Sequence, residues 1–322
     1  MPIAVVAIGG NSLVRPGQPD SIEEQRANLI TTCDGIAAVL KAGYRAVVTH
    51  GNGPQVGDAL MRSELAAGQV QSLPLDACVA ETQGTIGYLL EQVMVETLPR
   101  HGISCPVFTM VTQVLVSARD PAFRSPTKPV GRFYTREEAG RCRAGFGWHM
   151  VEDARRGFRR VVPSPQPEGI VELSAIQAAL DKNALVIACG GGGIPVVFQH
   201  GELVGVEAVI DKDRVSGLLA RELEADLFLI STGVEQVSLN YRTPAEQPLA
   251  AMTADEGRRY LREGQFPPGS MGPKVEAALE YLERGGKLVI ITAPECIPDA
   301  LYGLAGTRLT PAKQTTNLRR TA

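Results

Sequence analysis

Short apolar runs recur along the chain at intervals that leave room for a helix between them. Each run is continuous rather than alternating in polarity, which is typical of strands buried on both faces of a parallel sheet. The runs occupy residues 3–9, 44–49, 105–111, 184–190, 226–232 and 287–292. Strand and helix patterns alternate, so the sequence predicts an α/β fold, a three-layer αβα sandwich around a mainly parallel sheet.

The stretches between the apolar runs show helical periodicity and recognisable helix ends. Residues 21–43 begin with Ser21 three positions before Glu24, a capping-box pattern, and stop at a glycine. Apolar side chains recur inside this stretch at the spacing of one helix face. Residues 77–98 predict a second long helix, and a further helix is expected to follow Gly57.

Residues 119–169 interrupt the alternation of strands and helices. Two proline-rich pieces flank an arginine-rich stretch, and the segment is too long for a simple loop, so an inserted subdomain or lid is expected. A lobe boundary is placed near residues 201–207. We expect an N-terminal lobe over residues 1–206, which carries the lid, and a C-terminal nucleotide-binding lobe over residues 207–310. The polar tail 311–322 is expected to be disordered.

Composition and charge narrow the function classes. Hydrophobic residues make up 44% of the 322 residues, which is enough for a sizeable core. The formal net charge of −3 argues against nucleic-acid binding through a global positive field. The N-terminus lacks the positive region of a signal peptide, and no apolar run is long enough to span a membrane. The six cysteines include no C-x-x-C pair, so reduced thiols in a cytoplasmic protein are expected.

Three glycine-rich loops follow apolar runs and are candidate binding sites. They are Gly9-Gly10-Asn11, Gly51-Asn52-Gly53 and residues 190–193. In an open parallel sheet such loops lie at the carboxyl ends of the strands, where bare backbone amides can approach an anion. Each loop alone is also compatible with a tight turn. Together they favour a small anionic or phosphorylated ligand held by backbone N–H groups.

The positive charge for such a ligand would come from elsewhere in the chain. Only seven of the 32 basic residues are lysines, so a lysine in a glycine- or proline-rich motif stands out. Lys128 lies in SPTKPVG inside the predicted lid, Lys212 lies between two aspartates at a predicted helix start, and Lys274 begins another helix. Each could be an ordinary surface lysine. Jointly they indicate phosphoryl transfer, because a mobile ammonium is a compact charge suited to that group.

Motifs of several other enzyme classes are absent. The chain has no G-x-x-x-x-G-K-[ST], no G-x-G-x-x-G, no G-x-S-x-G and no H-E-x-x-H sequence. Its four histidines lack metal-ligand spacing. His50 precedes a glycine loop, and either contact with the site or a local structural hydrogen bond would explain it.

The order of the motifs resembles that of the carbamate kinases, a branch of the amino-acid-kinase superfamily. The resemblance rests on AIGGNS, THGNGPQVG, DPAFRSPTKPVG, VVPSPQP, CGGGGIPV, GVEAVIDKD and FPPGSMGPK, in the right order over residues 3–310. It implies a carbamate-kinase-like fold with a protruding lid, and the reaction ATP + carbamate ⇌ ADP + carbamoyl phosphate, run toward ATP in catabolism. It also implies Mg²⁺ on the ATP phosphates and a homodimer. Residues 292–308 resemble the catabolic carbamate-kinase-like paralogues.

The resemblance also implies roles for individual residues. Carbamate and the phosphoryl group would be held by backbone amides of Gly9, Gly10, Gly51 and Gly53, and by Asn11 and Asn52. The transferring and leaving oxygens would be stabilised by Lys128, Lys212 and Lys274. Asp213 would orient the lysines, whereas Asp211 could be structural. The nucleotide pocket would comprise Thr232, Gly233, Tyr241, Met271, Gly272 and Lys274, although core packing would also explain Tyr241 and Met271.

The chain departs at a few positions from the families it resembles. Acetylglutamate and UMP kinases carry a lysine two positions before the first glycine pair, where this chain has Ala7, and the resemblance implies that Lys128 and Lys212 replace that charge. Carbamate kinases often have proline at the position of Arg132 and glycine at that of Arg155. Both positions lie in the expected lid, so these departures leave lid closure and substrate preference open, but not the phosphoryl transfer. Two other functions stay open: a kinase of another small carboxylic acid, and a non-catalytic nucleotide- or ligand-sensing paralogue.

Overall fold

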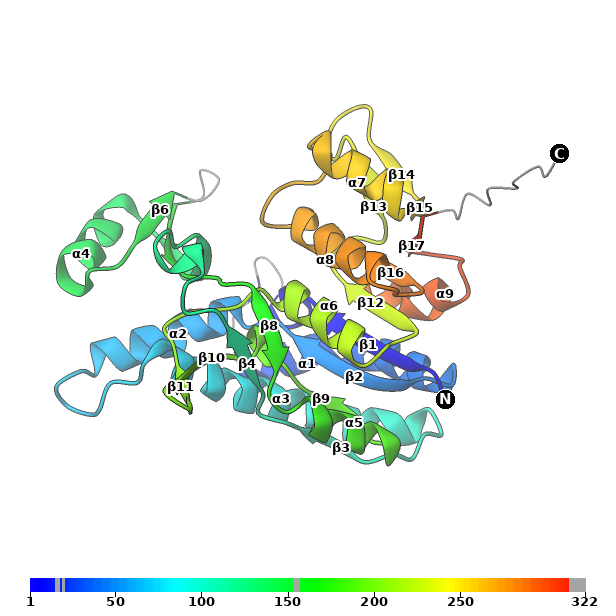
Figure 1. Ribbon diagram of the computed structural model, residues 1–322, viewed down its shortest axis with the longest axis horizontal. Helices are drawn as coiled ribbons and strands as arrows, with labels where there is room; N and C mark the ends of the chain where they lie inside the picture. Colours follow the sequence, from blue (N-terminus) through cyan, green and yellow to red (C-terminus); the bar gives the residue numbers. More distant parts are fainter. Residues whose placement is uncertain (15–17, 19–20, 153–156, 313–322) are drawn as a thin grey trace.

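The computed structural model describes residues 1–312, with gaps at 15–17, 19–20 and 153–156, and it does not describe the side chain of Asn11. Figure 1 shows a central sheet with helices packed on it and a small lobe that stands away from the main body. The predicted αβα sandwich is therefore confirmed. The expected disordered tail lies almost entirely outside the described residues, as does Arg155.

An eight-stranded sheet forms the middle layer. Its strands are β1 (Ile3–Ile8), β2 (Arg45–His50), β3 (Val107–Thr109), β9 (Leu185–Ile187), β12 (Leu227–Ser231), β15 (Ala251–Thr253), β16 (Val289–Thr292) and β17 (Thr307–Thr310). Their order is β15-β17-β16-β12-β1-β2-β9-β3. Every neighbouring pair is parallel except β16 and β17. The sheet is mainly parallel, as the apolar runs predict.

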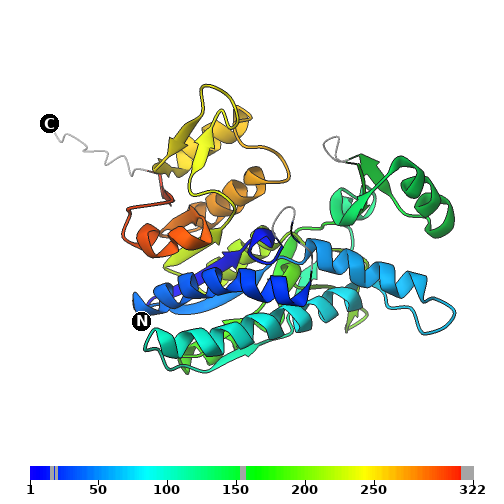
Figure 2. The same cartoon turned by 180° about the vertical axis from the view of Figure 1, so that it is seen from behind.

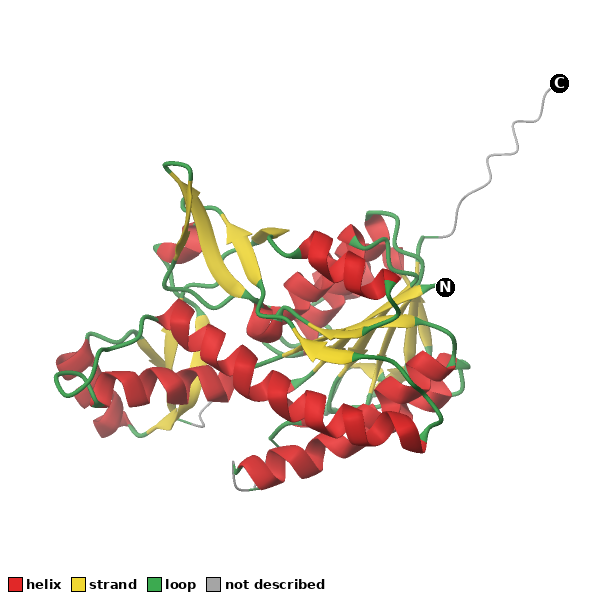
Figure 3. Cartoon of the chain, turned by 90° about the horizontal axis from the view of Figure 1, so that it is seen from below, coloured by secondary structure: helices red, strands yellow, loops and turns green. Residues whose placement is uncertain are grey.

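Helices cover both faces of the sheet (Figures 2 and 3). They are α1 (Ile22–Lys41), α3 (Leu75–Arg100), α5 (Leu173–Asp181), α6 (Lys212–Glu222), α7 (Ala254–Arg262), α8 (Met271–Glu283) and α9 (Ile297–Leu301). A further helix, α2 (Gly53–Leu65), packs on α3 and extends away from the sheet. Side chains of β1 alternate between the two faces. Val6 and Ile8 pack in one core with α1, α3 and α9, whereas Val5 and Ala7 pack in the other with α5, α6 and α8.

Smaller sheets lie outside the eight-stranded sheet. The strands β4 (Gln113–Val116), β8 (Pro167–Ile170), β10 (Ile194–Gln199) and β11 (Glu202–Gly205) form one sheet, and β13 (Val237–Leu239) pairs with β14 (Gln247–Leu249). The lid consists of β5 (Lys128–Tyr134), α4 (Arg136–Phe146), β6 (Met150–Glu152) and β7 (Phe158–Val162). It has its own small core around Trp148. An excursion within the predicted range 119–169 is thus present, although β8 at its end belongs to the main body.

Two local expectations are corrected by the structure. Residues 105–111 give only the short strand β3, which lies half-buried at the edge of the sheet rather than in its centre. The helix expected after Gly57 already begins at Gly53 and includes Gly57, because Pro54 fits the first helical turn without losing a hydrogen bond. The predicted cap of α1 is confirmed, since Ser21 Oγ accepts a hydrogen bond of 3.2 Å from Glu24 N.

The two expected lobes share one continuous sheet. The junction is the parallel pairing of β1 with β12, so hydrogen bonds join the N-terminal and C-terminal halves directly. The boundary near residues 201–207 stays a prediction. All six cysteines carry free thiols. In the ranges described above, no helix has the length and apolar character needed to cross a membrane.

Candidate active site

Four neighbouring parallel strands deliver their loops to one edge of the sheet. In the order β12-β1-β2-β9, each strand ends in a loop of small residues. These loops contain Thr232-Gly233, Gly9-Gly10, Gly51-Asn52-Gly53 and residues 190–193. Because they follow adjacent strands, the loops predicted separately from the sequence lie side by side. This edge is where open α/β sheets bind their ligands.

The loop at residues 190–193 is filled by neighbouring side chains. A Cβ on Gly190 would lie 2.3 Å from His50 Nε2, and one on Gly191 would lie 2.1 Å from Asn52 Nδ2. Gly191 also has a φ of 65°, which other residues rarely adopt. The glycines here therefore permit close packing, so this loop supports the β2 loop instead of offering open amides to a ligand.

The side chains of His50 and Asn52 hold the β2 loop in place. Asn52 Nδ2 donates to Thr82 Oγ1 at 2.8 Å, and the Asn52 side chain is buried. His50 Nδ1 lies 3.0 Å from the carbonyl oxygen of Gly51, so it must be the donor there. Burial lowers the pKa of His50 to about 4, although the hydrogen bond to Gly51 opposes this shift. At neutral pH the imidazole is therefore uncharged and structural.

This buried histidine predicts a pH-dependent stability. The unfolded chain binds a proton at His50 below about pH 6.5, whereas the folded chain does so only near pH 4. Stability is therefore lost as the pH falls, by about 2–3 kcal/mol between pH 6.5 and 4.5. Urea unfolding of wild-type protein and His50→Asn at both pH values tests this. The variant should lose distinctly less stability over that interval, and equal losses would contradict the assignment.

Two aspartates and three lysines form the charged part of the site. Asp211 caps α6, accepting a hydrogen bond from Asp213 N at 3.0 Å, and it also accepts one from Lys128 Nζ. Asp213 accepts from Lys212 Nζ at 2.7 Å and from Lys274 Nζ at 3.1 Å. Elements far apart in the sequence, β5, α6 and α8, thus bring all three predicted lysines together. The cluster carries one excess positive charge.

The cluster is buried, and its charges depend on each other. Burial alone would raise the pKa of Asp213, but Lys212 and Lys274 outweigh it and hold that pKa well below its usual range. Burial likewise opposes ionisation of Asp211, and Lys128 outweighs it, so the pKa of Asp211 is lowered. Burial lowers the pKa of Lys212 despite the favourable Asp213 carboxylate. The arrangement keeps charged ammonium groups beside the loops before any ligand arrives.

Lys212 is fixed between α6 and the β2 loop. Its carbonyl oxygen accepts a hydrogen bond of 2.6 Å from Ser216 Oγ, and Ser216 Oγ in turn lies 2.6 Å from Thr49 Oγ1 on β2. A Cβ on Gly51 would lie 3.2 Å from Lys212 Cδ, so the lysine stem runs along the bare backbone of this loop. A larger residue at Gly51 would displace the lysine.

Lys128 reaches the site because the lid crosses α2 at close range. A Cβ on Gly57 would lie 2.0 Å from the Cα of Gly131, so the backbones of α2 and β5 touch. Lys128 begins β5, three residues before this crossing. The crossing therefore fixes the distance from the lid lysine to the β2 loop, which immediately precedes α2.

A second contact fastens the lid to the far end of α2. Glu64 Oε1 accepts hydrogen bonds from Trp148 Nε1 at 3.0 Å and from Arg160 Nη1 at 2.9 Å. The Arg160 guanidinium also lies over the Trp148 ring, 4.5 Å from its centre. Among the described residues, the contacts of Arg132 lie within the lid: an ion pair of 3.2 Å with Glu138 and a guanidinium position 4.6 Å from the centre of the Tyr134 ring.

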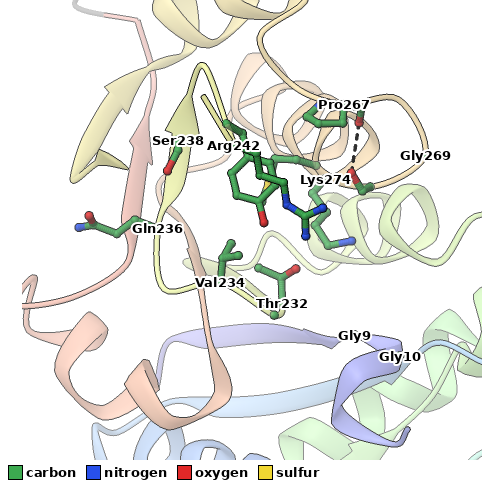
Figure 4. A pocket seen from close by; sticks show the side chains of 14 residues that line it. Gly9, Gly10, Thr232, Val234, Gln236, Ser238, Arg242, Pro267, Gly269 and Lys274 are labelled. Carbon is green, nitrogen blue, oxygen red and sulfur yellow. Dashed lines mark hydrogen bonds between the residues drawn. The ribbon is translucent and has the colours of Figure 1, made fainter. Parts of the chain in front are cut away.

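A pocket of about 440 Å³ opens beside the lysine cluster. Figure 4 shows Gly9 and Gly10 at one side of it, below Thr232, and Lys274 pointing into it from α8. Tyr241, Arg242 and Met271 also line it. The pocket therefore spans from the end of β1 to the C-terminal half, and its volume suits a ligand of nucleotide size.

Most residues predicted for the nucleotide line this pocket. They are Thr232, Gly233, Tyr241, Met271 and Lys274. Gly272 does not; a Cβ there would lie 3.2 Å from the carbonyl oxygen of Pro267, so it permits close packing beneath the turn. Tyr241 is 40% exposed, which excludes core packing as its role, whereas Met271 is half-buried and also packs on the core.

Some pocket residues escaped the sequence analysis, notably Arg242, Gln236 and Ser238. The only local signal was that Arg242 directly follows Tyr241. As for metal ligands, no group of three or more His, Cys, Asp or Glu side chains gathers anywhere in the described ranges. The site's two carboxylates are each paired with lysine, so the donor set suits an ion carried by the ligand's own oxygens better than a protein cage.

Comparisons with known proteins place this geometry in context. The model of the amino acid kinase family matches residues 2–293. A carbamate kinase-like protein of Escherichia coli is 48% identical over 311 residues, which cover 95% of this chain and 98% of that protein. Carbamate kinase of Thermococcus kodakarensis is 46% identical over 310 residues, with the same coverage of both chains.

A solved structure shows the same fold. Carbamate kinase from Giardia lamblia bound to AMP-PNP superposes with a TM-score of 0.89 and is 42% identical. The superposition covers 97% of this chain and 99% of that one. The similarity is therefore full-length in both directions and includes the lid.

Proposed function

The chain belongs to the amino acid kinase family and, within it, to the carbamate kinases, and from this premise we propose how its residues catalyse the reaction. ATP transfers its γ-phosphoryl group to carbamate, which gives ADP and carbamoyl phosphate, and the reaction is reversible. The observation that carries the mechanism is the convergence of Lys128, Lys212 and Lys274 on two aspartates beside bare glycine loops. In catabolism the flux runs toward ATP.

The nucleophile requires no general base. A carbamate oxygen is already anionic; it forms a bond to the γ-phosphorus while the bond to the β-bridging oxygen breaks, and no proton moves. The uncharged, hydrogen-bonded state of His50 agrees with this. Catalysis then consists of positioning and of charge stabilisation. Backbone amides of Gly9, Gly10, Gly51 and Gly53 hold the acceptor and the phosphoryl group. Asn52 fixes the loop after β2 through its hydrogen bond to Thr82. Binding of the acceptor by Asn11 stays a prediction.

The lysines divide the developing charge. Lys212 lies against the Gly51 backbone and stabilises the transferring group, Lys128 covers it from the lid, and Lys274 faces the nucleotide pocket and stabilises the leaving oxygen. Asp213 holds two of these ammonium groups, and Asp211 holds the third. Preorganised charges of this kind need no reorganisation during the reaction.

Mg²⁺ completes the proposal as an ion held by ATP. When bound, it neutralises charge on the β- and γ-phosphates. The paired state of Asp211 and Asp213 supports an ion held by nucleotide oxygens and water, with the protein supplying cations around it.

The reaction is tested in the direction of ATP formation. Purified protein with ADP, Mg²⁺ and carbamoyl phosphate should form ATP, and acetyl phosphate should not replace carbamoyl phosphate. Acetyl phosphate is the decisive control, because a relative that is 48% identical is named only carbamate kinase-like. ATP formation from acetyl phosphate alone would indicate another small acid as acceptor. Nucleotide binding without any turnover would indicate a sensing paralogue.

We also propose a homodimer that forms through α3 and β3. β3 is an edge strand, and Tyr88, Val95 and Val111 beside it are each more than half exposed around a groove of about 550 Å³. A second copy would cover these side chains and the strand edge. Light scattering at micromolar concentration should give twice the chain mass, and a monomer would contradict it.

The six free thiols support a cytoplasmic location.

A further inference from the structure

The nucleotide pocket contains a second cation that the mechanism above does not use. Arg242 lies on the loop between β13 and β14, and Lys274 lies on α8. Figure 4 shows the Arg242 guanidinium and the Lys274 ammonium directed into the same space, although they come from different elements. The space between them is part of the pocket of about 440 Å³.

The charge of Arg242 is not neutralised by the protein. Within the ranges that the structure describes, no carboxylate forms an ion pair with its guanidinium, and the nearby Glu246 carboxylate accepts from the Arg242 backbone N at 3.0 Å instead. The guanidinium lies 5.3 Å from the centre of the Tyr241 ring, which restricts its position. By contrast, Lys274 shares Asp213 with Lys212. An anion in the pocket would therefore find a cation free to pair with it.

The loop holds Arg242 in place at a conformational cost. Asn240 and Arg242 have φ values of 51° and 61°, in the left-handed region, which asparagine accepts more readily than most side chains and which is uncommon for arginine. Hydrogen bonds stabilise this shape: Gln265 Oε1 accepts from Asn240 N at 2.9 Å, and Thr243 Oγ1 donates to the Asn240 carbonyl at 2.7 Å. Backbone strain that the surroundings enforce is typical of ligand-binding loops.

We infer that Arg242 binds the non-transferred phosphates of the nucleotide. Its planar fork of N–H donors matches phosphate oxygens, and it lines the same pocket as Lys274 without belonging to the cluster of three lysines, to which the transferring group is assigned. This inference rests on the proposed function only in taking a nucleotide as the ligand. It assigns Arg242 to affinity for the phosphate chain rather than to the adenine ring or to the chemical step.

The test compares ligands that differ in their phosphates. Calorimetry with ADP and with adenosine is performed on wild-type protein, Arg242→Met and Arg242→Lys. ADP affinity should fall about tenfold in Arg242→Met and less in Arg242→Lys, because a charge-assisted hydrogen bond is lost or weakened. Adenosine affinity should change less than twofold. Arg284→Met, an exposed arginine at the end of α8, removes the same charge far from the pocket and should bind ADP normally.

Each alternative predicts a different result. An equal loss for ADP and adenosine would assign Arg242 to the base or to loop structure, and unchanged ADP affinity would remove it from the site; either overturns the inference. Arg242→Gly separates the two effects, because glycine accepts the left-handed φ while removing the guanidinium. It should weaken ADP binding as Arg242→Met does. Binding is measured without the acceptor, so absence of carbamoyl phosphate turnover would reject the proposed function and leave this result standing.

Discussion

Lys212→Met is expected to lower kcat for ATP formation from carbamoyl phosphate by about a thousandfold, which corresponds to about 4 kcal/mol of transition-state stabilisation. The reason is its position: the ammonium is held 2.7 Å from Asp213, and the stem lies against the Gly51 backbone. Lys274 shares the Asp213 carboxylate but belongs to α8, and it lines the nucleotide pocket. The KM for ADP should change far less, because Lys274 and the pocket remain.

The fold should survive this substitution. Asp213 keeps its ion pair with Lys274, so the buried carboxylate is not left alone. Circular dichroism and thermal unfolding check that point before kinetics are compared. Lys287→Met is the matched control, since Lys287 is an exposed lysine paired with Asp226 far from the loops, and its kcat should stay within twofold of wild type. Activity of folded Lys212→Met within tenfold of wild type would remove Lys212 from the mechanism.

Lys128→Met is expected to reduce kcat/KM for carbamoyl phosphate by about a hundredfold. Lys128 is the lid lysine that reaches the cluster, where it forms an ion pair with Asp211. Its loss removes one of the three cations of the cluster and leaves Asp211 without its lysine partner, so a phosphoryl group bound there would be less well stabilised. Steady-state kinetics with carbamoyl phosphate and with ADP as the varied substrate separate this effect from nucleotide binding.

The lid offers its own control. Arg132→Met removes a cation from the same strand, but Arg132 is half exposed and pairs with Glu138 inside the lid. It should therefore cost less than threefold. Trp148 is the chain's only tryptophan and lies where the lid meets α2, so its fluorescence reports whether the lid remains attached. Equal losses in Lys128→Met and Arg132→Met, with unchanged fluorescence, would show that only general lid charge matters.

The central sheet was predictable because strands that are buried on both faces are continuous apolar runs, which can be recognised from neighbouring residues alone. Strands such as β1 and β12 are continuous apolar runs, and α1 has its cap and its stop within one stretch of chain. β3 was misplaced for the same reason: an apolar run does not say whether neighbours flank it on both sides. Only the strand order puts it at the edge.

The candidate site was partly predictable for a different reason. Lysine is rare in this chain, so Lys128, Lys212 and Lys274 stood out by composition and motif. The sequence did not show which aspartates pair with these lysines. Lys128 and Asp211, for example, are 83 positions apart and meet only because the lid crosses α2. Arg242 was hidden among the many arginines of the chain and became a candidate only when the folded loop placed it in the pocket.

The sequence by itself determined the alternation of strands and helices, the glycine loops at strand ends and the three candidate lysines. Each of these features can be recognised in a short stretch of chain, without knowing which distant residues it contacts. Tertiary structure decided what each loop does. In the folded chain the Gly51 backbone lies against Lys212, whereas Gly190 and Gly191 are packed by His50 and Asn52. That distinction depends on which side chains fill the space around a turn. The strand order and the lid crossing fix those contacts, and no local pattern encodes them.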